Sequence, residues 1–578
     1  MQPNPIRLRD TSNHCRRNRS LSAVANPCVG LQTADNDRFL RQWFEVAQSR
    51  IGFGFENAAL AARSQKKWFP YNKGGITRKW YGNRELLVNW ENDGEEIKKF
   101  KAAVVRNPNF YFKKGITFPR IGTGIYNARY CEGGFVFDCN GPMCFGEDIY
   151  YHLAFLNSSI MTYLLQMLCP TMSFQIGDVF KVPIAYGKKD EVSEISKDNI
   201  AISKQDWDSH ETSWDFKRNP LFEMFLTIIE DEMQNVLPRG ISMNDVLQYA
   251  VPEAKHPLST CMHNYKDTWE TNFMRLHSNE EELNRQFIEI YGLQDELTPD
   301  VPLDEVTILQ KGEISIEDNK IVWHEDVIIK QFISWLIGCF MGRYSVDKPG
   351  LIIASQGQKI EDLDLPAQTI EIDDDGIIPI IQEEDFFVDD MTQRIEAAVK
   401  TLFGEMNFYE NMKYIKSRLG QNLRDYLYKN YYADHQQMYS VKGAKRPIYW
   451  LFSSQMGDRK KKGYFKALVY MHRMEADTLS KLHADYVHPY IQKIEQQLAE
   501  AEDNALRDDL TGKQKKNALD LAETLRDKVR EVKAFETALV EMASARITID
   551  LDDGVKANYP KFYPLVEPIK GLDKSNDD

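Results

Sequence analysis

Apolar and polar positions change their spacing several times along the chain, and each change predicts a different kind of element. Over residues 29–130, short alternating apolar runs lie between turns rich in Asn and Gly, which is typical of a mixed, loop-rich β region. Over residues 150–168, apolar residues recur at helical spacing, and Asn157, Ser158 and Ser159 interrupt them. Because short polar side chains cap helices, we expect a helix to be capped or to start at this interruption.

The rest of the chain has mainly helical periodicity. We expect helices over residues 231–300 and a buried helix over residues 332–352, ended by the Asp-Lys-Pro-Gly turn that begins at Asp347. Two later stripes of apolar residues have heptad spacing: Val487, Ile491, Ile494, Leu498, Ala501 and Ala505, and then Leu521, Leu525, Val529, Val532, Phe535 and Leu539. Two such helices joined near Gly512 predict an antiparallel coiled-coil hairpin.

Charge is distributed unevenly. The 578 residues carry a formal net charge of −14, but residues 61–130 contain 15 Lys and Arg against 5 Asp and Glu. Residues 411–462 contain 12 against 3, and residues 361–390 contain 12 acidic residues and no Lys or Arg. Two cationic segments in an acidic chain indicate focused local fields, whereas the acidic stretch is expected to be a solvated loop rather than a metal site.

Composition also excludes several classes of protein. No window approaches the roughly 18 consecutive apolar residues of a membrane span, and none of the eight cysteines forms a Cys-x-x-Cys pair. We therefore expect a cytoplasmic protein with reduced thiols, no bound metal and no membrane partner.

Aromatic rings are interleaved with the cations in both basic segments, a mixture suited to double-stranded DNA, because cations neutralise phosphates and planar groups stack or enter grooves. The alternative is a basic surface whose rings belong to the core. The candidate DNA-binding residues are Arg78, Lys79, Trp80, Tyr81, Asn83, Arg84, Lys113, Arg120, Tyr126, Arg129, Lys442, Lys445 and Arg446. If about 6–10 phosphates are contacted, affinity should fall by several orders of magnitude over a fourfold increase in salt.

Catalytic motifs are weak by comparison. Asn107–Phe110 reads Asn-Pro-Asn-Phe, which differs at its third residue from the Asn-Pro-Pro-aromatic tetrapeptide of adenine amino-methyltransferases. Ile51–Asn57 has two glycines but no strand-to-helix context for a cofactor loop, and Ile121–Tyr130 has a lone Gly-x-Gly. We therefore assign no catalytic and no cofactor-binding residue in this chain.

Several long segments resemble one family. They are GLQTADNDRFLRQWFEV, KWFPYNKGGITRKWYGNRELLVNWENDGEEIK, RNPNFYFKKGITFPRIGTGIYNARYCEGGFVFD, FLNSSIMTYLLQMLCPTMSFQIGDVFKVPI and YADHQQMYSVKGAKRPIYWLFSS. Together they are similar to the PglX family of adenine-specific DNA methyltransferases from the bacterial BREX phage-defence system, over roughly residues 29–572. The resemblance implies transfer of a methyl group from S-adenosylmethionine to N6 of adenine. It also implies a cofactor-binding domain ahead of the GLQT segment, where this sequence has 28 unrelated residues.

With the resemblance, the expected fold class is α+β: a loop-rich mixed-β target-recognition domain, mainly helical domains with the hairpin, and no complete Rossmann-like methyltransferase domain. The expected segments are an unstructured leader (1–28), the DNA target-recognition domain (29–190), a mainly helical domain (191–360), an acidic loop and basic aromatic α/β segment (361–474), the hairpin (475–545) and a C-terminal strand and tail (546–578).

Three functional hypotheses remain open. The first is the DNA-recognition portion of an adenine methyltransferase, paired with a separate catalytic chain or other BREX proteins and inactive alone. The second is a protein-interaction scaffold of a defence complex. The third is an active methyltransferase with an unrecognised cofactor site.

Overall fold

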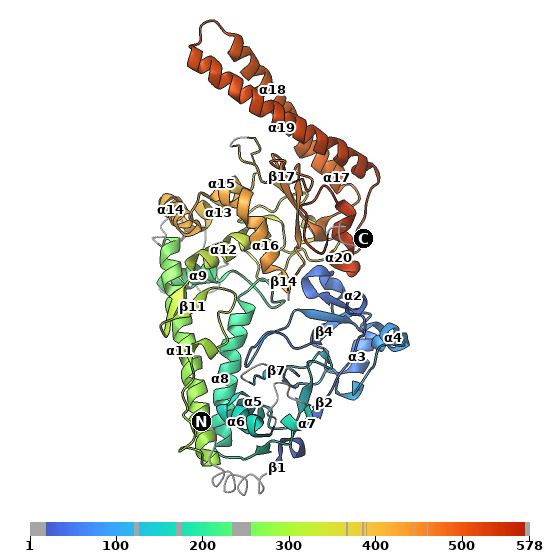
Figure 1. Cartoon of the computed structure of the whole chain (residues 1–578), viewed down its shortest axis with the longest axis vertical. Coiled ribbons are helices and arrows are strands. Elements are labelled where there is room, and N and C mark those ends of the chain that lie inside the picture. Colours follow the sequence, from blue (N-terminus) through green and yellow to red (C-terminus); the bar gives the residue numbers. More distant parts are fainter. Residues whose placement is uncertain are drawn as a thin grey trace. The chain divides into compact units, whose positions relative to one another are not determined.

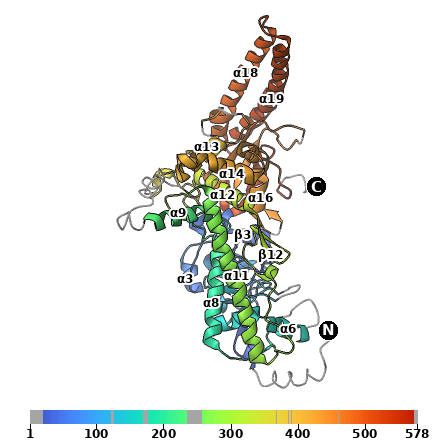
Figure 2. The ribbon, with the colours of Figure 1, turned by 90° about the vertical axis from the view of Figure 1, so that its left-hand side faces the viewer.

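The computed structural model describes residues 19–120, 126–168, 176–233, 256–365, 368–383, 386–388, 390–441, 443–458 and 460–572 (Figures 1 and 2). These residues form two compact units. Unit 1 takes the described residues of Met1–Trp43, Ser49–Phe216 and Tyr265–His324, and unit 2 takes those of Phe44–Gln48, Lys217–Asn264 and Glu325–Asp578. The described helices are all too short or too polar to cross a bilayer.

Unit 1 contains two four-stranded sheets. The first has the order β3 (Leu40–Gln42), β5 (Leu86–Asn89), β4 (Trp68–Asn72) and β8 (Val136–Phe137), and the second has β2 (Asn26–Cys28), β9 (Met143–Phe145), β6 (Gly115–Thr117) and β7 (Arg129–Cys131). All neighbours are antiparallel except β4 and β8. One apolar cluster takes residues from both sheets, including Phe69, Val88, Phe137 and Met143. Two smaller pairs are β1 (Arg19–Ser20) with β10 (Pro183–Ile184) and β11 (Ile314–Glu317) with β12 (Lys320–Trp323).

Helices complete unit 1: α2 (Asn36–Phe39), α3 (Ala58–Arg63), α4 (Glu91–Lys99), α5 (Ile149–Asn157), α6 (Ser159–Leu168), α7 (Ile176–Val179), α8 (Lys189–Asp208) and α11 (Leu258–Tyr291), whose first residues belong to unit 2. The interruption predicted within 150–168 is confirmed, because Ser158 is extended (ψ 157°) between α5 and α6. Tyr151 of α5 packs edge-on against Phe287 of α11, with ring centroids 5.5 Å apart.

Unit 2 is built on a three-stranded antiparallel sheet of β13 (Ile377–Pro379), β17 (Lys466–Tyr470) and β16 (Tyr449–Ser453), with a small pair β14 (Ser440–Val441) and β15 (Ala444–Lys445). Its helices are α9 (Pro220–Met233), α12 (Glu325–Phe340), α13 (Met391–Phe403), α14 (Phe408–Leu419), α15 (Leu423–Tyr426), α16 (Tyr432–Met438), α17 (Thr478–Lys481), α18 (His488–Leu506), α19 (Gly512–Ser544) and α20 (Gly554–Asn558). Together the units confirm the α+β class.

The two longest helices of the C-terminal region, α18 and α19, pack side by side (Figures 1 and 2). Ala501 of α18 and Ala522 and Leu525 of α19 form a buried cluster between them. A capping box between Thr511 and Gln514 starts α19. Most of the predicted apolar stripe is buried, but Leu521 is 51% exposed, and its neighbour Ala522 fills the seam because close helix packing favours the smaller side chain.

Several expectations require correction. Residues 19–28 are not unstructured, since β1 pairs with β10 and β2 pairs with β9. The helix expected over 332–352 is Glu325–Phe340, ended by Gly342 in the left-handed region (φ +77°). Within 546–572 the described backbone forms α20 and short 3₁₀ turns in place of a strand. Part of the predicted helical region, residues 234–255, lies outside the described residues.

The acidic stretch 361–390 is more than a solvated loop. Asp373 and Asp390 are 3% and 1% exposed. Asp373 pairs with Arg394 at 2.8 Å and Asp390 with Arg424 at 2.7 Å, and β13 lies between these two carboxylates in the sequence. Buried carboxylates of this kind need such partners to offset their lost hydration.

Candidate nucleic-acid interface

The first basic segment, Arg78–Arg84, connects β4 to β5 through an unusual backbone. Trp80 (φ +67°), Gly82 (φ +130°) and Asn83 (φ +57°) all have positive φ, a region that bulky side chains rarely adopt. A Cβ atom at Gly82 would lie 2.4 Å from Nε of Arg78. The segment is therefore a tight, specific turn that directs its side chains into unit 1.

Buried ion pairs hold these side chains. Arg78 pairs with Asp206 of α8, and Lys79 Nζ lies 2.6 Å from Oε2 of Glu280 of α11. The other oxygen of Glu280 accepts a hydrogen bond from Trp80 Nε1 at 2.7 Å. The turn thus fastens the β region to two long helices.

The remaining residues of this segment are also enclosed. Arg84 lies 3.8 Å above the Tyr81 ring and pairs with Glu132. The side-chain amide of Asn83 donates to the Ile76 carbonyl at 2.9 Å. All six predicted residues from Arg78 to Arg84 are 7% exposed or less.

Two later candidates, Tyr126 and Arg129, are 2% and 1% exposed. Nη1 of Arg129 donates to the carbonyl of Arg78 at 3.4 Å, and its Nε and Nη2 have no hydrogen-bond partner among the described residues. Burial lowers the pKa of Arg129 to about 10, although Glu85 opposes that shift. A phosphate needs an exposed cation, and these eight residues are buried in this conformation. We therefore expect them to position the region, and direct DNA contact by them stays a prediction.

The other predicted cations of unit 1 face solvent. Lys113 and Arg120 are exposed and flank β6. Neither forms an ion pair within the described part of the chain, and Lys113 lies 5.0 Å from the Phe110 ring centroid. Burial raises the pKa of the Cys28 thiol, and the charge of Lys113 partly opposes that rise. Lys113 therefore lies near Cys28 of β2. Both cations therefore border the β2-β9-β6-β7 sheet.

Three more exposed cations of this region were not among the predicted residues: Arg63, Lys101 and Lys114. No carboxylate among the described residues pairs with them. By contrast, Lys98 and Lys99 are exposed but paired with Asp93 and Glu95. The unpaired cations are the ones available for an anionic ligand.

In unit 2, the described candidate cations of the second basic segment also have partners within the protein. Lys442 lies outside the described residues. Half-buried Lys445 donates to Oε1 of Gln436 at 2.8 Å, and Nε of Arg446 lies 3.6 Å from Glu45. The rings between the cations are mostly core residues; Tyr426, Tyr431, Tyr432, Tyr449 and Trp450 are 7% exposed or less.

Asn107–Phe110 has a structural role. Asn107 adopts φ +51°, and its side-chain amide donates to the Val29 carbonyl at 2.9 Å. An amide held in this way fixes the loop to the segment that contains Val29.

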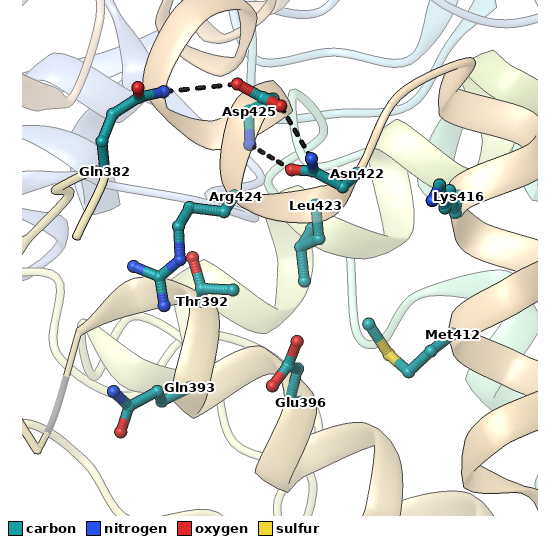
Figure 3. Close-up of a pocket in the computed structure, with 10 residues that line it drawn as sticks. All are labelled: Gln382, Thr392, Gln393, Glu396, Met412, Lys416, Asn422, Leu423, Arg424 and Asp425. Atoms are coloured by element: carbon teal, nitrogen blue, oxygen red, sulfur yellow. Dashed lines mark hydrogen bonds between the residues drawn. The ribbon is translucent and has the colours of Figure 1, made fainter. Parts of the chain in front are cut away.

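Unit 2 also contains a pocket of about 680 Å³, shown in Figure 3. Eight of its ten lining residues are polar: Gln382, Thr392, Gln393, Glu396, Lys416, Asn422, Arg424 and Asp425, beside Met412 and Leu423. Asn422 and Gln382 both donate to the Asp425 carboxylate, at 2.7 and 3.3 Å. Arg424 is held by Asp390 and by the Ile381 carbonyl. A wall this polar and internally bonded differs from the mostly apolar lining of small-molecule sites.

His483, His488 and Glu536 form a cluster of potential metal ligands that the sequence did not predict. The signal was present as two histidines five residues apart, followed by Pro489. A five-residue spacing does not place side chains together on a regular α-helix, so the pattern carried no weight.

Comparison with known proteins supports the resemblance. No protein-family model matches the chain. The chain is 34% identical over 569 residues to "Adenine-specific methyltransferase BrxX" of Escherichia coli O9:H4 (strain HS), covering 94% of this chain and 43% of that protein. It is 34% identical over 576 residues to "Adenine-specific methyltransferase PglX" of Lacticaseibacillus casei (strain Zhang), covering 95% of this chain and 43% of that protein.

The chain thus spans less than half the length of these relatives. The expectation that it matches their C-terminal part stays a prediction. Over nearly all of its own length, the chain is similar to part of the adenine-specific methyltransferases BrxX and PglX.

Proposed function

We propose that these residues form the DNA-recognition portion of a site-specific adenine methyltransferase of the BREX type, acting with a catalytic part that these residues do not supply. The observation that carries the proposal is the similarity to two adenine-specific methyltransferases over 94–95% of this chain. A methyltransferase needs both a cofactor domain and a surface that selects the target sequence. The β region of unit 1 is the better candidate for that surface.

The exposed cations of unit 1 support this assignment. Lys113 and Arg120 flank β6 without carboxylate partners among the described residues, and Lys101 and Lys114 are exposed nearby in the sequence. Cations without partners gain most from phosphates, because no existing ion pair must be broken. We assign phosphate contacts to Lys113 and Arg120, and a supporting role to the buried Arg78–Arg84 turn.

We infer that S-adenosylmethionine binds outside the described residues, and two observations support this. The two-glycine segment Ile51–Asn57 is closed by aromatic packing, because a Cβ atom at Gly52 would lie 2.5 Å from the Phe69 ring. The pocket of Figure 3 is lined mainly by polar side chains, unlike the mostly apolar lining that is typical of small-molecule sites. We therefore assign the methyl donor to the catalytic part.

The test measures the binding of duplex DNA to the full chain by fluorescence anisotropy at two salt concentrations. Lys113→Glu with Arg120→Glu should weaken binding and reduce the salt slope by about 2, since each lost phosphate contact removes about 0.9. A charge reversal at exposed positions should leave the circular dichroism spectrum unchanged.

Lys98→Glu with Lys99→Glu is the matched control, because these exposed lysines are already paired with Asp93 and Glu95. We expect a smaller loss in the control. Equal losses in the two double variants, or binding that does not respond to salt, would refute the assignment.

A protein-interaction role is the second candidate, favoured by exposed apolar side chains on α18 and α19. Leu506 is 80% exposed, Leu519 55% and Leu521 51%. Exposed apolar side chains that form one patch are typical of docking surfaces, and this role requires these leucines to act together. Their replacement by serine should leave DNA binding intact and abolish co-purification of a defence partner if this role is correct.

A further inference from the structure

A cluster of two imidazoles and a carboxylate lies where α17 and α18 meet α19. We propose that His483, His488 and Glu536 form a binding site for a transition metal ion, Zn²⁺ in the first instance, that joins the base of α18 to α19. This site is independent of the proposed DNA-recognition role.

An irregular turn of helix brings the two histidines together. Thr478–Lys481 is α-helical, Leu482–Val487 is π-helical, and α18 then begins at His488. On a regular α-helix, side chains five residues apart are rotated by about 140° from each other. A π-helical turn bonds residue i to residue i+5 and places them on one face.

The sequence explains why the turn widens at this point. Pro489 follows His488, lacks an amide hydrogen and carries a ring that collides with the carbonyl of residue i−4 in an α-helix. A wider turn ahead of the proline relieves that collision. Such single π turns often occur at functional sites.

The third ligand comes from α19. Oε1 of Glu536 lies 2.9 Å from Nε2 of His483 and 3.1 Å from Nδ1 of His488. The three ligand atoms all lie within 4.8 Å of one another. A tetrahedral Zn²⁺ with bonds of about 2.0–2.1 Å holds its ligand atoms about 3.3 Å apart, so small side-chain movements suffice to bind the ion.

Exposure suits a site that fills from solvent. The side chains of His483, His488 and Glu536 are 30%, 50% and 21% exposed. Three protein ligands leave a fourth position for water. Two imidazoles and one carboxylate suit Zn²⁺ and neighbouring transition metals, whereas Ca²⁺ and Mg²⁺ prefer oxygen ligands only.

A neighbouring amide can support the site. Nε2 of Gln492 lies 3.0 Å from Nε2 of His488. When Nδ1 of His488 binds a metal, Nε2 carries the proton, and the Gln492 side chain then turns its oxygen towards it. Metal-bound histidines usually donate their second N–H in this way.

The test is titration of the full, untagged and chelator-treated chain with Zn²⁺ by calorimetry, and with Co²⁺ by absorption spectroscopy. We expect one strong site per chain and the visible band of tetrahedral Co²⁺. His483→Ala, His488→Ala and Glu536→Gln should each weaken Zn²⁺ binding at least about tenfold. Added Zn²⁺ should also raise the melting temperature of the parent chain, because the ion binds only the folded form.

His277→Ala is the matched control, because His277 lies 3.6 Å from the Glu281 carboxylate and belongs to no cluster of three potential ligands among the described residues. The control should bind Zn²⁺ as the parent does. If the three ligand variants bind Zn²⁺ as tightly as the parent, or if Co²⁺ keeps the spectrum of the hydrated ion, the site does not exist. The Glu536→Gln variant keeps a hydrogen-bond acceptor, so we expect it to fold as the parent does, with an unchanged melting temperature in the absence of Zn²⁺.

Discussion

Removal of the Glu280 carboxylate should destabilise unit 1 more than any exposed charge change. Glu280 is 4% exposed and contacts both Nζ of Lys79 and Nε1 of Trp80. Glu280→Ala removes the carboxylate that pairs directly with the buried Lys79 ammonium and leaves only the more distant Glu305 near it. Loss of one partner of a buried pair costs about 3–5 kcal/mol. The orphaned indole N–H would cost about 1–3 kcal/mol alone. The two losses come from one deletion and are not additive, so we expect a total cost of about 4 kcal/mol.

The free energy of unfolding can be measured by urea denaturation, with tryptophan fluorescence as the signal. Eight of the ten tryptophans belong to unit 1, and only Trp335 and Trp450 belong to unit 2. The signal therefore reports unit 1, and the free energy of unfolding follows from linear extrapolation.

Two further variants isolate the charge. Glu289→Ala, on the same helix, breaks an exposed pair with Lys188 and should cost far less than Glu280→Ala, because solvent screens an exposed pair. Lys79→Met with Glu280→Gln removes both charges, keeps an acceptor for Trp80 and should recover most of the lost stability. If Glu280→Ala costs no more than Glu289→Ala, or if the double variant is as unstable as Glu280→Ala, the buried pair does not fasten the turn.

Three other predictions are as direct. Gly82→Ala should lower the urea midpoint more than Gly54→Ala, because both have positive φ but only Gly82 has atoms in the way of a Cβ; equal effects would mean that backbone strain alone matters. Burial, and then repulsion from Asp373, raise the pKa of Asp375 to about 7, above its unfolded value of about 3.9. The stability that its protonation provides is therefore complete below about pH 4 and is lost as the pH rises through 7. The gain in melting temperature from Asp375→Asn should be larger at pH 8 than at pH 5, and a gain independent of pH would contradict the assignment. Finally, the chain incubated with labelled S-adenosylmethionine and duplex DNA should transfer no methyl group, and incorporation of label would overturn the proposed division of labour.

The sequence predicted those structural features that depend on interactions between residues close together in the chain. The break at Ser158 between α5 and α6 follows from residues within a few positions of it, and so does the apolar stripe of α18 and α19. In these places the amphipathic or capping signal lies within one element.

The burial of Arg78–Arg84 could not be predicted from the neighbouring sequence. Asp206 lies 128 positions from Arg78, and Glu280 lies 201 positions from Lys79. A cation has the same local signature whether it meets a phosphate or a distant carboxylate. The turn residues around Gly82 indicated an irregular connection, but only the packing of α8 and α11 decides which way its side chains point.

The same burial changes the expected salt dependence of DNA binding. Of the cations in residues 61–130, Arg78, Lys79, Arg84 and Arg129 are buried, and Lys98 and Lys99 are paired. The exposed, unpaired cations described in this region are Arg63, Lys101, Lys113, Lys114 and Arg120.

If all five of these cations meet phosphates, the logarithm of the binding constant should fall with the logarithm of salt concentration with a slope of about −4.5. A fourfold increase in salt would then weaken binding about 500-fold, less than the 6–10 contacts inferred from composition would give. Anisotropy titrations at three or more salt concentrations measure the slope. A value steeper than about −6 would mean that cations outside this region, or the buried ones after rearrangement, reach the DNA. A value near zero would mean that these five cations do not bind DNA.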